Sequence, residues 1–586
     1  MIIVRTTRLL GSWLAIGLSF LFTVADGFSA QPFPGSATDY GGVTQYSLAI
    51  DGQAVTVLVP EKPAPGKPWV LAPSLYRLDS PPVASMGRTQ IELVQRGLHV
   101  VVMDLGNTFG APSAIARWDG CYETMTETYG LSAKVALMGL SRQGLSIARW
   151  AAAHPGKVAC LYMDKAVCDF KSWPGGKLDI GKGSANDWMQ LQKLYGFASE
   201  AEALAFDQNP VDLAPQLVAD GIPIVYLAGE ADDIVPYAEN GARMEKVYRD
   251  LGGTFRLIMR EGEGHHPHGL EHPWPVADFV QLFSSPLPRP TQVDVAYGTH
   301  PRQVLHFWQA KADRPAPLLF FIHGGGWVGG HRLSGLGTLL ATMLERGISV
   351  VSIEYRFLED GKQDGVDPPV HACLHDAARA LQWVRSRAEA WNIDKQRIVA
   401  SGGSAGACTS LWLAFHDDLA DPLSPDPVAR ESTRLLGAAV SGAQTTLDPL
   451  LMRQWIPNAF YGSHAFGIVR AVPRQPLLLE AGHFSHDIET FLAQRPSRLP
   501  QIEEYSPFSL ATADDPPVYL LYRDPPAPQQ MQRDPTHSAN FGVMLQERLQ
   551  QVGVGCELVY PGASDVRYPK LEDYLIERLT SATLPQ

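Results

Sequence analysis

The sequence predicts an α/β fold built as two tandem domains, each a mostly parallel sheet flanked by helices. With 586 residues, the chain is too long for one ordinary hydrophobic core. Two segments, 135–150 and 398–406, each read as a buried apolar strand that turns sharply into a helix. The proline-rich stretch 284–290 lies between them and is typical of a linker. We therefore expect domains at 40–285 and 295–586, joined at 286–294.

Residues 1–30 predict a secretory signal peptide. Arg5 and Arg8 precede a mostly apolar stretch at 9–24, and small residues that suit a cleavage site follow it. The stretch is short for a stable membrane span, and no second one exists in the sequence. We expect a periplasmic or secreted protein with no stable membrane span after signal removal, with an uncleaved anchor as the alternative.

The composition of the chain limits which classes of partner and cofactor are expected. The net charge of −13 argues against nucleic acid or an anionic membrane surface as a partner. The six cysteines form no Cys-x-x-Cys pair and are expected to be mostly buried thiols, although export would permit a disulfide such as Cys160–Cys168. The histidines at 265–268 make a metal site a minor alternative, so neither a metal nor an organic cofactor is expected. The oligomeric state is left open.

Ser141 lies at the first strand-to-helix turn, where it is a candidate nucleophile. Residues 135–138 are apolar, and the small Gly139 and Gly144 make room for a strained turn. The hydroxyl would then stand at a helix N-terminus, where backbone amides and the helix dipole stabilise an oxyanion. The pattern departs from Gly-x-Ser-x-Gly because Gln143 occupies the fifth place.

Two later strands end in the acid and base that such a serine needs. Residues 225–236 run from an apolar strand into a loop with Asp232, and residues 255–266 run into a loop with His265. A serine hydroxyl is a poor nucleophile at neutral pH, so it needs an imidazole as general base and a carboxylate that orients the imidazole. The chain order is therefore Ser, Asp, His.

This arrangement resembles the α/β-hydrolase superfamily throughout the first domain. The resemblance implies that Ser141 is the nucleophile, Asp232 the orienting carboxylate and His265 the base. The adjacent Asp233 and His266 remain alternatives.

The same resemblance implies an oxyanion hole. The family places its third strand and the following loop at 69–76, so one donor is assigned to the backbone amide of Leu75 or Tyr76. The other donor is the amide of Arg142, the residue after the nucleophile. Residues 168–188, rich in Gly, Lys and Trp, form either a sugar-binding face or a plain cap over the core.

The second domain carries more specific motifs. A buried strand from 318 runs into a glycine loop, and a later strand turns into a helix at Ser404. Over residues 295–570 these motifs resemble the hormone-sensitive-lipase-like esterases and the related feruloyl and xylan esterases. In that family the glycines let the backbone approach the substrate and offer amides to the oxyanion. The implied loop consists of His323, Gly324, Gly325 and Gly326.

The second domain departs from this family at the acid and the base. A proline stands where the acid is expected, which leaves only Asp524 two residues early, and Asp565 stands where the family has its histidine. Without a base, Ser404 would be an unactivated alcohol. His537, at a predicted helix start, is the one nearby substitute. We therefore expect the second domain to be degenerate, with rescue by His537 as the alternative.

Together these features predict an exported serine esterase that acts through an acyl-serine intermediate on small-molecule or polysaccharide esters. Acetyl or feruloyl groups on polysaccharides are expected from analogy at the level of the fold. One alternative is a serine peptidase of the prolyl-oligopeptidase type, which the lack of a preceding repeat array disfavours. The other is a hydrolase-shaped binding protein whose second domain is a carbohydrate-binding or interface module.

Overall fold

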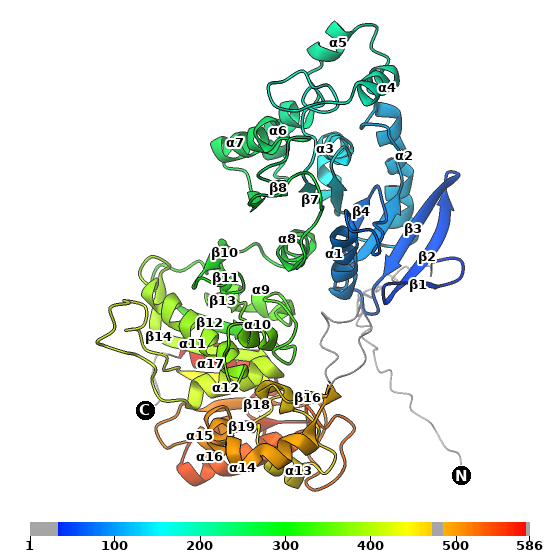
Figure 1. Ribbon diagram of the computed structural model, residues 1–586. Coiled ribbons are helices and arrows are strands. Elements are labelled where there is room, and N and C mark those ends of the chain that lie inside the picture. Colours follow the sequence, from blue (N-terminus) through cyan, green and yellow to red (C-terminus); the bar gives the residue numbers. More distant parts are fainter. Residues whose placement is uncertain (1–32, 471–484, 582–586) are drawn as a thin grey trace, which may run out of the picture.

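The computed structural model of the protein describes residues 33–470 and 485–581 (Figure 1). The predicted signal peptide lies outside these residues. The described chain forms two mixed sheets, of nine and eight strands, and a small two-stranded sheet. The prediction of a mixed α/β fold with two sheets is therefore confirmed.

The first sheet has the strand order β1-β2-β3-β5-β4-β6-β7-β8-β9, and the strands from β5 to β9 along this order are parallel. Its strands are β1 (Thr38–Tyr40), β2 (Val43–Ile50), β3 (Gln53–Val59), β4 (Trp69–Ala72), β5 (His99–Met103), β6 (Val135–Leu140), β7 (Val158–Asp164), β8 (Ile224–Gly229) and β9 (Phe255–Arg260). Its helices are α1 (Ala84–Gln95), α2 (Pro112–Glu123), α3 (Gln143–Ala153), α4 (Ala185–Tyr195), α5 (Glu200–Ala205), α6 (Pro210–Ala219), α7 (Gly241–Leu251) and α8 (Trp274–Ser284).

The second sheet has the order β10-β11-β13-β12-β14-β15-β18-β19. Its strands are β10 (Gln292–Ala296), β11 (Val304–Trp308), β12 (Ala316–Ile322), β13 (Ser349–Ile353), β14 (Ile393–Gly403), β15 (Gly437–Ser441), β18 (Val518–Leu521) and β19 (Cys556–Val559); β16 (Val469–Arg470) pairs with β17 (Ser485–His486). Its helices are α9 (Gly337–Glu345), α10 (Leu358–Gln363), α11 (Val370–Ser386), α12 (Ala405–Phe415), α13 (Pro449–Trp455), α14 (Ile488–Glu504), α15 (Pro507–Leu510), α16 (Asn540–Val552) and α17 (Leu571–Thr580).

The two sheets share one topology. From β2 and from β10 onward, each begins with an antiparallel hairpin, continues with six parallel strands, and exchanges the order of its third and fourth strands. The central strands β4 to β8 and β12 to β13 are buried along their whole length except at Leu140, the last residue of β6, as expected for parallel strands with helices on both faces. The carboxyl ends of such strands place polar loops at one edge, where both serine turns occur.

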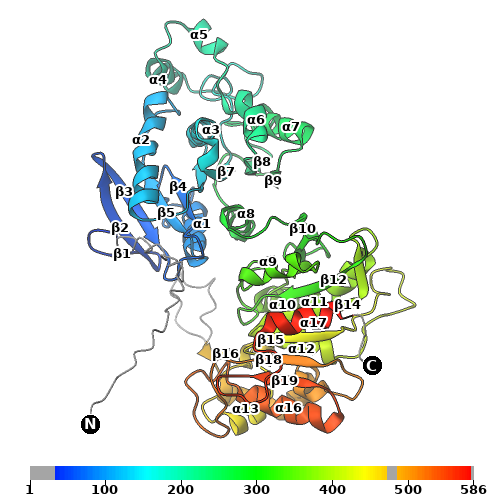
Figure 2. The ribbon, with the colours of Figure 1, turned by 180° about the vertical axis from the view of Figure 1, so that it is seen from behind.

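Helix α8 lies between the two halves in both views (Figures 1 and 2). Its Leu282 belongs to the same hydrophobic cluster as Trp308 and helix α17 of the second half. On the same helix, Asp278 forms ion pairs with Arg96 of the first half and, at 2.9 Å, with Arg332 of the second. Strand β10 begins at Gln292, inside the predicted linker, so the connection is shorter than expected.

All six cysteines are free, so the disulfide that export would permit between Cys160 and Cys168 is not formed. Across the described ranges, no helix has both the length and the apolar character needed to cross a membrane.

Candidate active sites

Ser141 occupies a strained turn between β6 and α3. Its φ is 50°, and its backbone is held on both sides, because its amide donates to the Asp164 carbonyl (2.9 Å) and its carbonyl accepts from the Val167 amide (2.9 Å). A Cβ on Gly144 would lie 2.7 Å from the Cβ of Ala166, so only glycine fits there. These backbone hydrogen bonds and the close packing therefore hold Ser141 at a positive φ that an unconstrained loop would not keep.

The structure brings Ser141, His265 and Asp232 together. Ser141 Oγ lies 3.0 Å from His265 Nε2, and His265 Nδ1 lies 2.8 Å from Asp232 Oδ2. An ionised carboxylate only accepts, so Nδ1 carries the proton and Nε2 is free to accept from the serine. Asp232 Oδ1 accepts from the amides of Ile234 (3.0 Å) and Val235 (2.9 Å), which fixes the carboxylate. Both side chains are buried, with exposed fractions of 6% for His265 and 2% for Asp232.

The neighbouring alternatives lie elsewhere. Asp233 forms an ion pair with Lys182 at the surface, and His266 is exposed. The geometry therefore favours Asp232 and His265 over the residues beside them.

Of the two backbone amides predicted as oxyanion donors on the loop after β4, that of Tyr76 already donates a hydrogen bond within the protein. The Tyr76 amide donates to Gln90 Oε1 at 3.2 Å, which leaves the Leu75 amide as the candidate on this loop beside the Arg142 amide. The Tyr76 hydroxyl itself donates to Gln143 Oε1 at 2.7 Å. Burial is the largest cause that raises the pKa of Tyr76, so this hydroxyl stays protonated and keeps donating.

Gln143 explains why the elbow departs from Gly-x-Ser-x-Gly. Its Oε1 also accepts from the Leu140 amide (3.0 Å), and its Nε2 donates to Ser74 Oγ (2.9 Å). One side chain thus ties the nucleophile turn to the loop that carries the oxyanion candidate. Sequence reasoning treated Gln143 only as a mismatch and missed this role.

A cap of aromatic residues packs beside the first site, against the residue that follows Ser141. The Arg142 guanidinium lies over the Trp173 ring, 4.9 Å from its centre, and donates to Asn107 Oδ1 at 2.9 Å. Trp173 and Trp188 are both buried in the hydrophobic core of the cap. The interpretation of these tryptophans as an exposed sugar face is therefore wrong, and the plain-cap interpretation fits.

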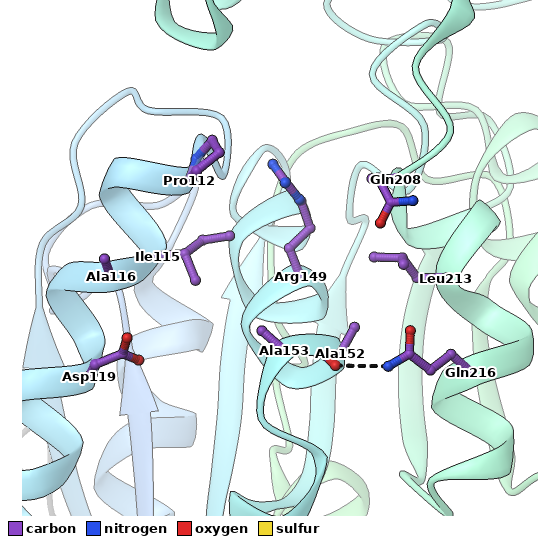
Figure 3. A pocket seen from close by; sticks show the side chains of 10 residues that line it. All are labelled: Pro112, Ile115, Ala116, Asp119, Arg149, Ala152, Ala153, Gln208, Leu213 and Gln216. Atoms are coloured by element: carbon purple, nitrogen blue, oxygen red, sulfur yellow. Dashed lines mark hydrogen bonds between the residues drawn. The ribbon is translucent and has the colours of Figure 1, made fainter.

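A separate hollow of about 380 Å³ opens between α2, α3 and α6 (Figure 3). Arg149 points into it between the helices, and Gln216 closes its lower end by donating to the Ala152 carbonyl at 2.9 Å. No residue of the triad lines this hollow, so it is not the reaction site.

Ser404 occupies the equivalent turn of the second sheet, between β14 and α12. Its φ is 55°, and its amide donates to the Ser441 carbonyl at 3.0 Å. A Cβ on Gly402 or on Gly406 would overlap the Ile322 carbonyl oxygen, so both glycines are required where the turn crosses β12. The strand-to-helix reading of this segment is therefore correct in geometry.

Ser404 also has a base and an acid. Its Oγ lies 2.9 Å from His537 Nε2, and His537 Nδ1 lies 2.8 Å from Asp534 Oδ2. The expectation that the second domain lacks a base is at odds with these distances. The geometry agrees with the alternative in which His537 is the base. The acid of this site, Asp534, was missed by sequence reasoning.

The positions where the family pattern places acid and base are not used. Asp524 and Asp565 are both exposed, and neither contacts Ser404. Acid and base instead come from one loop after β18, so a search restricted to the usual strand ends misses the acid. The signal that could have found Asp534 is the Asp-x-x-His spacing directly before a helix.

The loop with His537 is held by its own hydrogen bonds. Asp534 Oδ1 accepts from the amides of Thr536 and His537, both at 3.2 Å, and Gln444 Nε2 donates to the Thr536 carbonyl at 2.7 Å. Partial burial works to raise the pKa of Asp534, but its bonds to His537 and to the loop amides hold the pKa below its usual value. This site is more open than the first, since the side chains of His537 and Asp534 are 39% and 50% exposed.

The glycine loop of the second site approaches Ser404 closely. A Cβ on Gly324 would lie 2.6 Å from the Gly403 carbonyl oxygen and 3.4 Å from Ser404 Cβ. Gly325 and Gly326 have φ values of 109° and 62°, which favour glycine. His464 Nε2 lies 3.0 Å from the Gly326 carbonyl and fixes the end of the loop.

His323 supports this loop from below. It is fully buried, its Nε2 lies 3.3 Å from Glu354 Oε1, and its carbonyl accepts from the Tyr355 hydroxyl at 2.9 Å. His323 is therefore an anchor for the loop and not a second base for Ser404.

Two sheets of this topology, each with a serine at a strand-to-helix turn, have the architecture of the α/β-hydrolase fold. Residues 306–432 match the model of the BD-FAE family. The chain is 26% identical over 305 residues to the esterase LipC of Mycobacterium tuberculosis, which covers 51% of this chain and 66% of LipC. It is 27% identical over 236 residues to the probable carboxylic ester hydrolase LipM of the same organism, which covers 39% of this chain and 46% of LipM. The chain thus spans less than two thirds of the length of these curated relatives.

Among solved structures, a truncated carbohydrate esterase from gut microbiota aligns with a TM-score of 0.35 and 17% identity, covering 50% of this chain and 96% of that one. The sequence matches therefore place residues 306–432 in similarity to the BD-FAE family, and larger parts of the chain are similar to curated esterases.

Proposed function

We propose that this protein is a carboxylic ester hydrolase with two serine sites, at Ser141 and Ser404. The observation that carries the proposal is the same at both: a serine Oγ within 3.0 Å of an imidazole Nε2 whose Nδ1 faces a carboxylate at 2.8 Å. Such an arrangement raises the nucleophilicity of a hydroxyl, which hydrolysis requires and binding alone does not.

At the first site, His265 Nε2 takes the proton as Ser141 Oγ attacks the ester carbonyl. The amides of Arg142 and Leu75 then donate to the developing oxyanion, each contributing about 3 kcal/mol to its stabilisation. The protonated His265 gives its proton to the leaving alcohol, and the same nitrogen later takes a proton from the water that releases the acyl group. Asp232 stabilises the imidazolium throughout.

At the second site, His537 and Asp534 perform these steps for Ser404. The amides of Gly325 and Gly326, with that of Ala405 after the nucleophile, are the oxyanion donors. The greater exposure of this dyad suits a bulky alcohol that remains outside the pocket, such as a sugar chain.

We infer that the natural substrates are acyl esters on carbohydrates, with acetyl and feruloyl groups as the candidates, and that the protein is exported. The BD-FAE match over 306–432 supports the esterase class, and the apolar stretch at 9–24 supports export. The acyl group is to be found with an ester panel that includes acetylated and feruloylated oligosaccharides.

The test is labelling of the purified protein with a fluorophosphonate, followed by mapping of the modified serines, on the parent chain and on Ser141→Ala, Ser404→Ala and the double variant. We expect both serines to be labelled in the parent, each single variant to keep the other label, and the double variant to lose ester hydrolysis. Labelling of only one serine would reduce the proposal to that site. Absence of both labels in a folded protein would overturn it in favour of a binding protein.

A further inference from the structure

Three histidines gather at the end of β9, beside Ser141. The ligating nitrogens of His265, His266 and His268 all lie within 4.8 Å of one another. We propose that these residues bind one Zn²⁺ ion. The bound ion then occupies the nitrogen of His265 that otherwise acts as the base for Ser141. This site is additional to the proposed hydrolysis, which needs no metal.

His268 provides the first ligand. Its side chain is 1% exposed, and its Nδ1 lies 2.6 Å from Asp164 Oδ1. The carboxylate accepts the Nδ1 proton, which leaves the lone pair of Nε2 free. Within the described part of the chain, this buried Nε2 has no hydrogen-bond partner. A buried nitrogen without a partner is costly, and a metal ion would satisfy it.

The carboxylate behind His268 is itself fixed. Asp164 Oδ2 accepts from the Tyr162 hydroxyl at 2.9 Å and from the Gly269 amide at 2.8 Å, so the acid cannot turn away from the ring. A carboxylate that holds the far nitrogen of a histidine is the usual second layer of a zinc site.

His265 is arranged in the same way. Asp232 takes its Nδ1 proton, so the nitrogen that faces Ser141 carries a lone pair. The tautomer that makes His265 a base is thus the tautomer that binds a metal. His266 is exposed, so it can capture an ion from solvent and complete the set of three.

Local charge permits a cation here. Asp164 and Asp232 place two carboxylates behind the rings. Glu263 adds a third, beside the guanidinium of Arg260, with which it forms an ion pair, and beside Lys165, whose ammonium lies 3.5 Å from it. That ammonium is turned toward the Gly264 and Pro267 carbonyls, both at 2.8 Å.

The rearrangement needed is small. Tetrahedral zinc with bonds of about 2.0 Å to nitrogen requires nitrogens about 3.3 Å apart, so the rings would move inward by about 1 Å. Three nitrogen ligands with a fourth position left open are a common coordination of zinc in proteins. Because His265 has one lone pair on Nε2, Zn²⁺ and the Ser141 proton compete for it, and bound zinc silences the first site.

The second site provides an internal control. Among the residues that the structure describes, no comparable histidine group surrounds His537. Zinc should therefore slow labelling of Ser141 by fluorophosphonate and leave labelling of Ser404 unchanged in the same molecule.

The experiment measures Zn²⁺ binding by calorimetry and metal analysis on the chelator-treated full chain, and labelling of each serine with and without the ion. The variants are Ser141→Ala, which keeps all three ligands, His266→Ala, His268→Ala, and the control His154→Ala, which removes a histidine outside the group. We expect one ion per chain in the parent, Ser141→Ala and His154→Ala, and at least a tenfold weaker affinity in His266→Ala and His268→Ala. In His266→Ala, the rate of labelling at Ser141 should be the same with and without zinc.

Unchanged zinc affinity in both ligand variants would overturn the proposal. So would an equal loss of label at both serines, which would indicate a general effect. The stoichiometry is measured without catalysis, so failure of the zinc site and failure of the esterase proposal are distinguishable.

Discussion

His537 lies three residues after Asp534, and its Nδ1 is 2.8 Å from Asp534 Oδ2. In the first site, the equivalent pair, His265 and Asp232, is separated by 33 residues and comes from the loops after two strands. The second pair therefore depends on one loop for its geometry and stands in contact with solvent, whereas the first is buried between strands.

This difference predicts unequal costs when each carboxylate is neutralised. Asp232→Asn should slow labelling of Ser141 by about 10⁴-fold, because a buried amide stabilises the wrong tautomer and leaves the imidazolium without a counter-charge. Asp534→Asn should slow labelling of Ser404 by a smaller factor, about 10²-fold, because water screens the lost charge. Labelling rates at each serine measure both effects in one chain.

The matched controls are the acids beside each site. Asp233→Asn and Asp524→Asn change a surface carboxylate near the same loops and should leave both rates unchanged. An equal loss in Asp233→Asn would return the acid assignment to Asp233.

Gly325→Ala should silence the second site alone. The glycine has a φ of 109°, and a Cβ there would overlap the Gly329 carbonyl oxygen, so the oxyanion loop must move. We expect a loss of about 10²-fold or more in labelling of Ser404, the size seen when one oxyanion donor is removed. Gly329→Ala, at a position with open space around its Cβ, is the control. Retained labelling in Gly325→Ala would show that other amides hold the oxyanion.

Asp278→Ala should destabilise the junction between the halves. Asp278 is buried between Arg96 and Arg332, and these two cations hold its pKa well below the usual range against the effect of burial. Removal takes one carboxylate from each of two buried guanidinium groups; Arg96 keeps Glu92 and Arg332 keeps Asp294, so the cost stays below the about 3–5 kcal/mol of a fully uncompensated buried charge. Urea unfolding measures the loss. The control Asp79→Ala breaks an exposed ion pair with Arg77 and should change little.

Stability should fall as the pH drops below about 6.5, the ordinary pKa of histidine. Burial lowers the pKa of His99 to about 4 and that of His464 to about 3. The unfolded chain then binds protons that the folded chain excludes, and by pH 5 each residue has cost about 2 kcal/mol. Melting temperatures between pH 7.5 and 5 test this. His464→Gln, which can still donate to Gly326, should flatten the pH dependence.

The order of elements and the first triad could be predicted because strand periodicity, glycine positions and the order Ser, Asp, His are local signals. Of the second site, Ser404 and the alternative base His537 could be named from the sequence, but the acid Asp534 could not, because it occupies a loop position where the family pattern has no acid. The Trp173 and Trp188 rings were also misread, since residue type alone does not distinguish an exposed aromatic platform from the core of a cap. Gln143 shows the same limit: two of its three bonds, to Tyr76 and Ser74, reach a part of the chain that only the fold brings close.

Helix α8 ends the first half of the chain but packs Leu282 into the second, with Asp278 bonded to both. Cutting the gene at the proline-rich connection would therefore expose apolar surface around Leu282 and break the ion pair between Asp278 and Arg332. Expression of the intact chain is the sound starting point for assigning an activity to either serine.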